Sequence, residues 1–272
     1  MTPRQERILH AIVETYARTA EPVGSNALCE HFETSSATIR SEMAVLENLG
    51  YIMQPHISAV RVPTDKGYRA YVNSLESPDH DQRHEQALAR RVKSAGEVER
   101  AIKNAVESLA HVTGNLGLGT IGPNLYLSGM AALFQHPEFY GGREAYEVAR
   151  LLDSLEEWLA EAAPGDPISV YIGRENPIGR ASGATLIISR FESPFSTRSY
   201  IGVLGPTRQQ YSPVIGLVEY TGRLLEEAST NTAKGDVICP RKRPHLTHLQ
   251  SSPTLHQSAK VNPTRLQTKP PN

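Results

Sequence analysis

Five side chains that can exchange hydrogen bonds with nucleobases fall within seven residues of the chain: Ser35, Ser36, Thr38, Arg40 and Ser41. Ser and Thr hydroxyls both donate and accept hydrogen bonds, and an arginine guanidinium can bond two atoms of a guanine edge at once. Such groups at the start of a helix are typical of a helix that reads bases in the DNA major groove. An ordinary solvated helix face with a capping serine pair is the alternative interpretation.

A second group of polar side chains follows in the segment 54–72, QPHISAVRVPTDKGYRAYV. We expect them to lie in a short loop, in a returning strand and in the next helix, and to contact DNA phosphates: His56, Ser58, Arg61, Lys66 and Arg69. Phosphate contacts position a protein on the duplex and make its binding depend on salt. His56 taken alone also fits a neutral loop residue.

The elements around these side chains predict how they are positioned. Ile39, Met43, Leu46 and Leu49 recur at spacings of 4, 3 and 3, so one side of this helix should face a core and the polar residues should face outward. Two helices should precede it, the first with Thr2 and Gln5 as a capping box, and two short strands and a helix capped by Thr64 should follow. This order predicts a winged helix-turn-helix over residues 1–75.

The distribution of charge limits how such a module could bind DNA. The net charge of the 272 residues is −1, and residues 1–75 hold seven Lys or Arg against eight Asp or Glu. DNA affinity would therefore depend on the local placement of a few cations and on two copies acting together. Residues 229–272 hold seven Lys or Arg and one acidic residue, and their Pro, Ser and Thr content predicts a disordered basic tail.

Residues 76–114 predict a polar linker followed by one amphipathic helix. Apolar residues from Leu88 to Val112 lie three or four positions apart, close to the 3.5-residue repeat of a coiled coil. We expect this stripe to pair with its copy in a homodimer through Leu88, Val92, Ile102 and Leu109. Packing of the same stripe against the chain's own carboxy-terminal domain is the alternative.

Residues 115–228 predict a small α+β domain. Helices are expected around 125–134, over 143–162 and over 213–227, and strands over 168–172, 184–189 and 200–204. Gly117, Gly119 and Gly122 formally fit a dinucleotide-binding loop, but no strand is expected before them, which favours a flexible joint. The polar side chains expected near strand ends could contact a ligand or simply hold turns: Arg174, Asn176 and Arg208.

Several classes of protein are disfavoured by the sequence. It contains no recognisable catalytic set, phosphate-binding loop or metal-ligand spacing, so we expect neither an enzyme nor a bound cofactor or metal. Its two cysteines, Cys29 and Cys239, lie far apart and fit a reducing cytosol better than a disulfide framework. No apolar run approaches the roughly 20 residues that cross a bilayer, so we expect a soluble cytoplasmic protein without a membrane partner.

Motifs along most of the chain are similar to those of the heat-inducible transcription repressor family HrcA. They are PVGS at 22–25, SSATIRSEMAVLENLGY at 35–51, QPHISAVRVPTDKGYRAYV at 54–72, NLYLSGMAALFQHPEF at 124–139, VYIGRENP at 170–177 and IGVLGPTRQQYSPVIGLVEYTGRLL at 201–225. The resemblance implies a winged helix, a linker and a GAF-like α+β domain. It also implies a dimeric repressor of chaperone genes that binds an inverted-repeat operator (CIRCE) on double-stranded DNA and depends on the GroE chaperonin.

This sequence departs from the family pattern in three places. Ile57 and Val60 stand in the wing where a small polar residue and a glycine are usual. About a dozen residues, 113–124, replace the first strands and the dimerisation insert of the GAF-like domain, which predicts a truncated domain. The basic tail has no counterpart in the pattern. Two alternatives to chaperonin-dependent repression follow: a winged-helix regulator controlled by a small ligand in the GAF-like domain, and an interaction module that no longer binds DNA.

Overall fold

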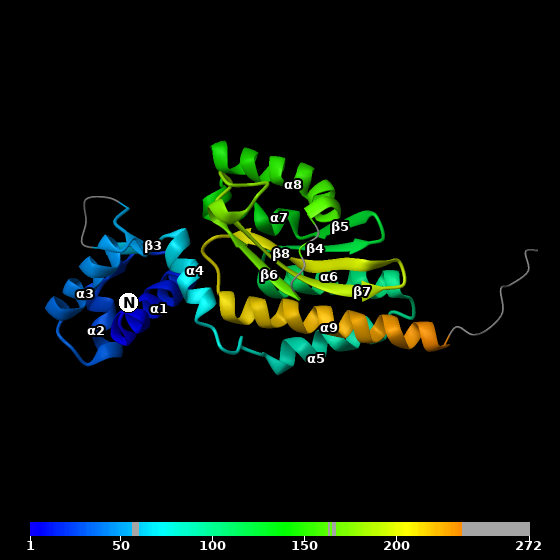
Figure 1. The fold of residues 1–272 in the computed structure, drawn as a ribbon, viewed down its shortest axis with the longest axis horizontal. Coiled ribbons are helices and arrows are strands. Elements are labelled where there is room, and N and C mark those ends of the chain that lie inside the picture. The colour runs from blue at the N-terminus through cyan, green and yellow to red at the C-terminus, as the bar shows by residue number, and fades with distance from the viewer. Residues whose placement is uncertain (56–59, 163, 165–166, 236–272) are drawn as a thin grey trace, which may run out of the picture. The chain divides into compact units, whose positions relative to one another are not determined.

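The computed structural model describes residues 1–55, 60–162, 164 and 167–235 (Figure 1). Its amino-terminal part holds four helices and a small three-stranded sheet. These elements are α1 (Pro3–Thr19), β1 (Val23–Gly24), α2 (Ser25–Phe32), α3 (Ser36–Asn48), β2 (Ile52–Met53), β3 (Val60–Pro63) and α4 (Asp65–Asn73). The order is that of a winged helix-turn-helix, as the sequence predicted.

Side-chain caps fix where three of these helices begin. The Thr2 hydroxyl accepts from the Gln5 backbone N–H at 3.2 Å, and the Gln5 side chain accepts from the Thr2 N–H at 2.9 Å, so the predicted capping box is confirmed. Ser35 caps α3 and Thr64 caps α4 in the same manner. Helix α2 begins at Ser25, and Gly24 occupies its cap position without a side-chain hydrogen bond.

The small sheet has the order β1-β3-β2, with antiparallel pairs on both sides of β3. Its helices bury a compact apolar core that includes Ile8, Leu9, Ile12, Leu28, Ile39 and Leu46, each with no exposed surface. Leu49 was predicted to complete the inward stripe of α3, and this prediction is wrong. It follows the last residue of α3 as the cap, and its side chain is 42% exposed.

The carboxy-terminal part is built around one antiparallel sheet of five strands in the order β5-β4-β8-β7-β6. Its elements are α5 (Gln82–Lys93), α6 (Val98–Thr113), β4 (Leu116–Ile121), β5 (Asn124–Ser128), α7 (Met130–Leu133), a 3-10 turn η1 (Pro137–Phe139), α8 (Gly142–Ala162), β6 (Ile168–Ile172), a second turn η2 (Gly173–Glu175), β7 (Ala184–Ser193), β8 (Ser196–Pro206) and α9 (Tyr211–Gly235). The helices lie on both faces of the sheet (Figure 1).

Alternate side chains of each strand enter two separate cores, as the two-residue period of a strand requires. Ile187 and Val203 face α6 and α9, and α5 packs on those two helices. Leu186 and Leu204 face the other way, toward α7 and α8. The three-layer arrangement confirms the predicted α+β class. Because helices cover both faces of the sheet, the central strands consist almost entirely of apolar residues.

The single long helix predicted over residues 86–112 is wrong, because it is two helices. Gly96 lies between α5 and α6 with a φ of +76°, a left-handed conformation that glycine adopts without the usual steric cost. The expected dimerisation residues are all within the chain's own core: Leu88 and Val92 are 1% and 2% exposed, and Ile102 and Leu109 have no exposed surface. The coiled-coil seam is therefore corrected to packing against the carboxy-terminal sheet and α9.

Three further predictions about the carboxy-terminal part are corrected. Residues Gly117 and Gly119 lie in the buried strand β4, so this glycine-rich segment is not a flexible joint. The helix expected around 125–134 is a strand, β5, followed by the short helix α7. Helix α9 continues to Gly235, beyond the predicted start of the tail at residue 229. The prediction of disorder for 236–272 lies outside the described residues.

Candidate nucleic-acid interface

The outer side of α3 carries the side chains that could enter a DNA groove. Ile39, Met43 and Leu46 fix its inner side, since they are 0%, 3% and 0% exposed. The helical repeat then places exposed side chains on the opposite side: Ala37, Arg40, Ser41, Ala44, Val45 and Asn48. Most of these are small, so the helix backbone can come close to a bound surface.

Ser36 lies at the centre of a hydrogen-bond network that joins α2 to α3. Its hydroxyl donates to the Asn26 side-chain oxygen at 2.7 Å and lies 2.8 Å from the Ser25 hydroxyl, which is buried. The Arg40 Nη2 donates to the same Ser36 oxygen at 3.2 Å. Ser36 therefore holds the turn between the two helices and orients the Arg40 guanidinium.

Of the other predicted α3 residues, Ser35 and Thr38 form the cap of the helix, and Ser41 presents an exposed hydroxyl. Ser35 Oγ accepts from the Thr38 backbone N–H and lies 2.9 Å from the Thr38 hydroxyl, so both side chains are engaged at the start of the helix. Ser41 is exposed one turn later. Among the predicted α3 residues, Arg40 and Ser41 are exposed and lie beyond the capping turn, which leaves them in place for base contacts.

Two predicted phosphate-binding cations form contacts within the winged-helix part. Arg61 makes an ion pair with Glu47 through Nη2 at 2.8 Å and donates to the Val60 carbonyl oxygen at 3.1 Å. Lys66 donates to the Leu49 carbonyl oxygen at 2.7 Å, with its ammonium 4.6 Å from the centre of the Tyr51 ring. Lys66 remains exposed beside the end of α3, whereas the charge of Arg61 is balanced by Glu47.

Arg69 lies in a different contact, between α4 and the carboxy-terminal sheet. Its guanidinium pairs with the Glu175 carboxylate and donates to the Val170 carbonyl oxygen of β6. Nearby, the Arg174 backbone N–H donates to Asp65 at 3.0 Å. A guanidinium that is occupied in this way must break an ion pair before it can bind a phosphate.

The wing itself is described only at its edges. Val60 pairs with Gly24 in the β1–β3 ladder, in an extended conformation that suits a β-branched residue. His56, Ile57 and Ser58 lie outside the described residues. Their predicted roles remain predictions.

Sequence reasoning missed two residues that shape this surface. Asn26 is exposed on α2 and bonded to Ser36, and Glu47 on α3 neutralises Arg61. Neither is visible from helical periodicity, because each acts on a residue of another element. The family motif PVGS ends one residue before Asn26. Its position is the one feature of the sequence that could have indicated that the start of α2 belongs to the same surface.

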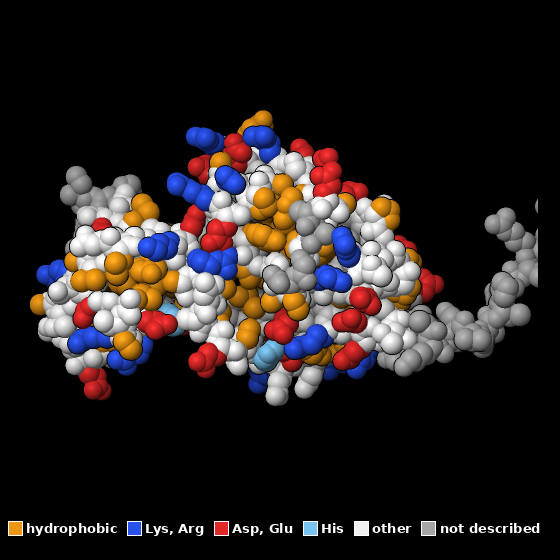
Figure 2. Space-filling model, viewed as in Figure 1, with side chains coloured by type: hydrophobic (Ala, Val, Ile, Leu, Met, Phe, Trp, Pro, Cys, Tyr) orange, Lys and Arg blue, Asp and Glu red, His pale blue; other side chains and the backbone are white. Residues whose placement is uncertain are grey.

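Charge on the winged-helix part is mixed. Blue and red side chains are interspersed over the face of this part seen in Figure 2, without an extended basic field. This agrees with the near balance of acidic and basic residues in 1–75. Specific binding at this surface would therefore rely on a few positioned contacts and gain little from long-range attraction.

The remaining residues singled out from the sequence lie in the carboxy-terminal part. Arg174 is exposed, and Asn176 is fully buried with its side-chain oxygen 3.3 Å from the Ile178 N–H. Arg208 is half-buried, bonded to Glu138 and to the Ala17 carbonyl oxygen of α1.

In the part of the chain that the structure describes, no cluster of three His, Cys, Asp or Glu could hold a metal ion. No helix there is both long enough and apolar enough to cross a bilayer.

A winged helix with an exposed α3, followed by a three-layer α+β domain, defines a transcription regulator of the winged-helix class. Residues 1–75 match the family described as "Winged helix-turn-helix transcription repressor, HrcA DNA-binding", and residues 70–215 match the family "HrcA protein C terminal domain". The chain therefore belongs to the HrcA family of heat-inducible transcription repressors.

Curated relatives agree with this assignment. The heat-inducible transcription repressor HrcA of Gloeobacter violaceus is 43% identical over 132 residues, which are 47% of this chain and 37% of the relative. The HrcA of Synechococcus elongatus is 45% identical over 125 residues, 44% of this chain and 35% of the relative. In these two alignments the chain spans little more than a third of the length of its relatives.

A longer alignment and one solved structure cover most of the chain. The HrcA of Geobacter sulfurreducens is 25% identical over 332 aligned positions, which take in 83% of this chain and 97% of the relative. Because 332 exceeds the 272 residues present here, the relative has positions without a counterpart in this chain. A crystal structure of a hypothetical protein shares the fold at a TM-score of 0.71 and 20% identity, covering 85% of this chain and 99% of that one.

Proposed function

We propose that this protein represses chaperonin and chaperone genes by binding, as a homodimer, an inverted-repeat operator of the CIRCE type in double-stranded DNA. The observation that carries the proposal is the outer side of α3, where Ser36 and Asn26 orient Arg40 beside the exposed Ser41. The relatives' shared description as heat-inducible transcription repressors supports the choice of genes. Repression would be steric, because a dimer on the operator excludes polymerase.

The geometry supports recognition in the major groove. An α-helix fits this groove, and the residues near its amino-terminal end then reach base edges. Arg40 would bond a guanine, Ser41 would bond a neighbouring base edge, and the methyl groups of Val45 would face a thymine methyl group. Ser35 and Thr38 start the helix, and Lys66 would bind a phosphate from the end of α3.

Two copies are needed because a single winged helix offers few contacts. Its charge is nearly balanced, and Arg61 and Arg69 are already paired with Glu47 and Glu175. An inverted repeat gives each copy one half-site, so the contacts add without a larger basic surface. We further propose that the GroE chaperonin promotes the active form, which the family resemblance implies.

Duplex binding tests the proposal directly. Purified protein is titrated against a duplex that carries the inverted repeat and against a scrambled duplex of the same length, at several salt concentrations, with and without chaperonin. We expect preference for the repeat, a modest salt dependence that reflects few phosphate contacts, and tighter binding with chaperonin. Equal binding to both duplexes would contradict operator recognition, and an unchanged affinity with chaperonin would contradict that dependence alone.

A further inference from the structure

An open hollow of about 630 Å³ lies beside the first turn of α8. Three arginines from three separate segments line it: Arg143 from α8, Arg174 from η2 and Arg180 from the turn before β7. All three residues are exposed, so a ligand in the hollow can reach them. Figure 2 shows Lys and Arg side chains gathered at the amino-terminal end of α8, with a few acidic side chains beside them.

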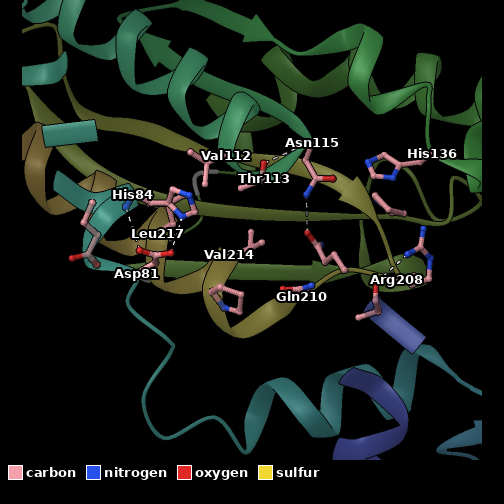
Figure 3. Close-up of a pocket in the computed structure, with 15 residues that line it drawn as sticks. Asp81, His84, Val112, Thr113, Asn115, His136, Arg208, Gln210, Val214 and Leu217 are labelled. Atoms are coloured by element: carbon pink, nitrogen blue, oxygen red, sulfur yellow. Dashed lines mark hydrogen bonds and ion pairs between the residues drawn. The ribbon is translucent and has the colours of Figure 1, made fainter. Parts of the chain in front are cut away.

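The charges of these three arginines are not balanced by ion pairs. Across residues 1–55, 60–162, 164 and 167–235, none of their guanidiniums has a hydrogen bond or an ion pair. The arginine of another pocket differs, since Arg208, which Figure 3 shows among the lining residues, is paired with Glu138. Guanidiniums that share one hollow repel one another, and a bound anion would remove that repulsion.

The backbone that carries Arg174 is held in place. Its N–H donates to the Asp65 carboxylate at 3.0 Å. The preceding residue, Gly173, has a φ of +49°, and an added Cβ there would lie 2.6 Å from either oxygen of Asp65. Only glycine allows this close approach, so the turn presents Arg174 to the hollow from a fixed position.

The turn that carries Arg180 is fixed against α8. The buried Ser182 hydroxyl donates to the Gly179 carbonyl oxygen at 2.6 Å and closes the turn. Gly179 lies so close to α8 that an added Cβ would be 2.3 Å from the Leu151 side chain. Arg143 begins the same helix, so all three arginines stand on anchored backbone.

The rest of the lining excludes a ligand with a large apolar body. Its other residues are Gly173, Ala181 and Gly183, which offer little apolar surface, and the acidic Asp65 and Glu144. Three arginines against two carboxylates give the lining a net charge of +1, and the Asp65 carboxylate already accepts from the Arg174 N–H. Most small-molecule pockets are apolar, so this lining favours a hydrated, multiply charged anion.

We propose that this hollow binds an oligophosphate, a chain of linked phosphate groups that is either free or part of a nucleotide. The guanidinium fork matches the spacing of phosphate oxygens, and a chain of phosphates can bond more than one guanidinium at once. Arg143, Arg174 and Arg180 would hold the anion, and Glu144 would limit its affinity by repulsion. This site goes beyond operator recognition and gives a role to the VYIGRENP motif, which contains Arg174.

Calorimetric titration of the full chain, without DNA and in a phosphate-free buffer, tests this assignment. The probes are inorganic triphosphate, ATP and orthophosphate. We expect triphosphate to bind, and orthophosphate to bind about tenfold more weakly or not at all, because one phosphate group cannot bond several guanidiniums. ATP that binds at least as tightly as triphosphate would assign the site to a nucleotide, and weaker ATP would assign it to free oligophosphate. Failure of both to bind, or equal binding of orthophosphate, would overturn the proposal.

Variants of exposed residues locate the site. Arg143→Gln, Arg174→Gln and Arg180→Gln should each weaken triphosphate binding about threefold to fivefold, the loss of one exposed ionic contact. Glu144→Gln should instead tighten binding, because it removes a negative charge from the same lining. Arg100→Gln, an exposed change on α6 outside the lining, is the control and should bind as the unaltered chain does. Unchanged affinity in all three lining variants would overturn the assignment.

The phosphates of DNA are the competing occupant. The three arginine variants are therefore also titrated with the operator duplex at several salt concentrations. We expect the slope of log affinity against log salt to stay unchanged. A slope reduced by about one phosphate contact in each variant would assign the arginines to the DNA backbone and overturn the proposal. Because the calorimetric titrations contain no DNA, their failure is distinguishable from a failure of operator binding.

Discussion

At the scale of single residues, the Ser36 hydroxyl has contacts with Ser25, Asn26 and Arg40, all at 3.2 Å or less. From the sequence, Ser36 is one of several candidate base-reading hydroxyls. In the structure its hydroxyl is committed to the α2–α3 turn, which leaves Arg40 and Ser41 as the residues best placed to reach bases. Arg40 reaches the surface with part of its conformational freedom already restricted by that hydrogen bond, and this lowers the entropic cost of binding.

Replacement of Arg40 by Ala should therefore weaken operator binding and relax base preference at one position of each half-site. The expected loss is roughly 1–3 kcal/mol for each bidentate contact. The measurement is a gel-shift titration with the operator and with single-base variants of it. Arg100→Ala is the matched control, because Arg100 is an exposed arginine of α6. Equal operator affinity for Arg40→Ala and the unaltered protein would remove Arg40 from the interface.

At the scale of elements, α6 belongs to the core of the carboxy-terminal domain. Ile102 has no exposed surface and packs in the cluster between the sheet and α9. Ile102→Asp should therefore destabilise the fold by about 3 kcal/mol or more, since an unpaired charge would be buried there. Thermal unfolding checks this, with Arg100→Asp on the exposed side of the same helix as the control. A folded, monomeric Ile102→Asp protein with an unchanged melting temperature would restore the dimerisation role.

The contact of α4 with β6 leads to a second prediction at this scale. Arg69 pairs with Glu175, and the side chains are 30% and 36% exposed, so the pair should contribute at most about 1 kcal/mol to stability. Arg69→Ala should lower the melting temperature slightly and leave the salt dependence of operator binding unchanged. Glu175→Ala should have the same small effect on stability. A salt slope reduced by about one phosphate contact in Arg69→Ala would instead support the predicted phosphate role.

The elements that the sequence predicted well are those with local signals. The capping box at Thr2, the cap at Thr64, strand β6 over Ile168–Ile172 and most of α8 follow from caps and periodicity alone. The wrong predictions lie where tertiary packing determines the local structure. Strand β4 is buried on both faces, so its small residues resemble a loop, and a positive φ at Gly96 interrupts a helical repeat that continues across it.

The candidate site was also predictable where its signals are local, and not where distant residues meet. Helix α3 and its outward residues follow from the spacing of Ile39, Met43 and Leu46. The partners that change the roles of Ser36, Arg61 and Arg69 lie 10, 14 and 106 positions away in the chain. No periodic pattern links such positions, so the ion pairs and the asparagine network required the structure.

At the scale of the whole molecule, the proposed repression requires two copies of the chain. The apolar stripe of α5 and α6 is used inside each chain, so a dimer must form through another surface. Sedimentation equilibrium of the purified protein should give twice the chain mass of 29.9 kDa at micromolar concentration. A single-chain mass both free and on the operator would contradict the dimeric mechanism and leave each winged helix to bind alone.

The proposed function depends above all on recognition of an operator by the outer side of α3. A nuclease footprint on the region upstream of the chaperonin genes tests it most directly, with the unaltered protein and an Arg40→Ala, Ser41→Ala variant compared side by side. We predict protection of both arms of an inverted repeat by the unaltered protein and loss of that protection in the variant, with melting temperatures unchanged. Absence of protection by the unaltered protein, or equal protection by the variant, would contradict the claim.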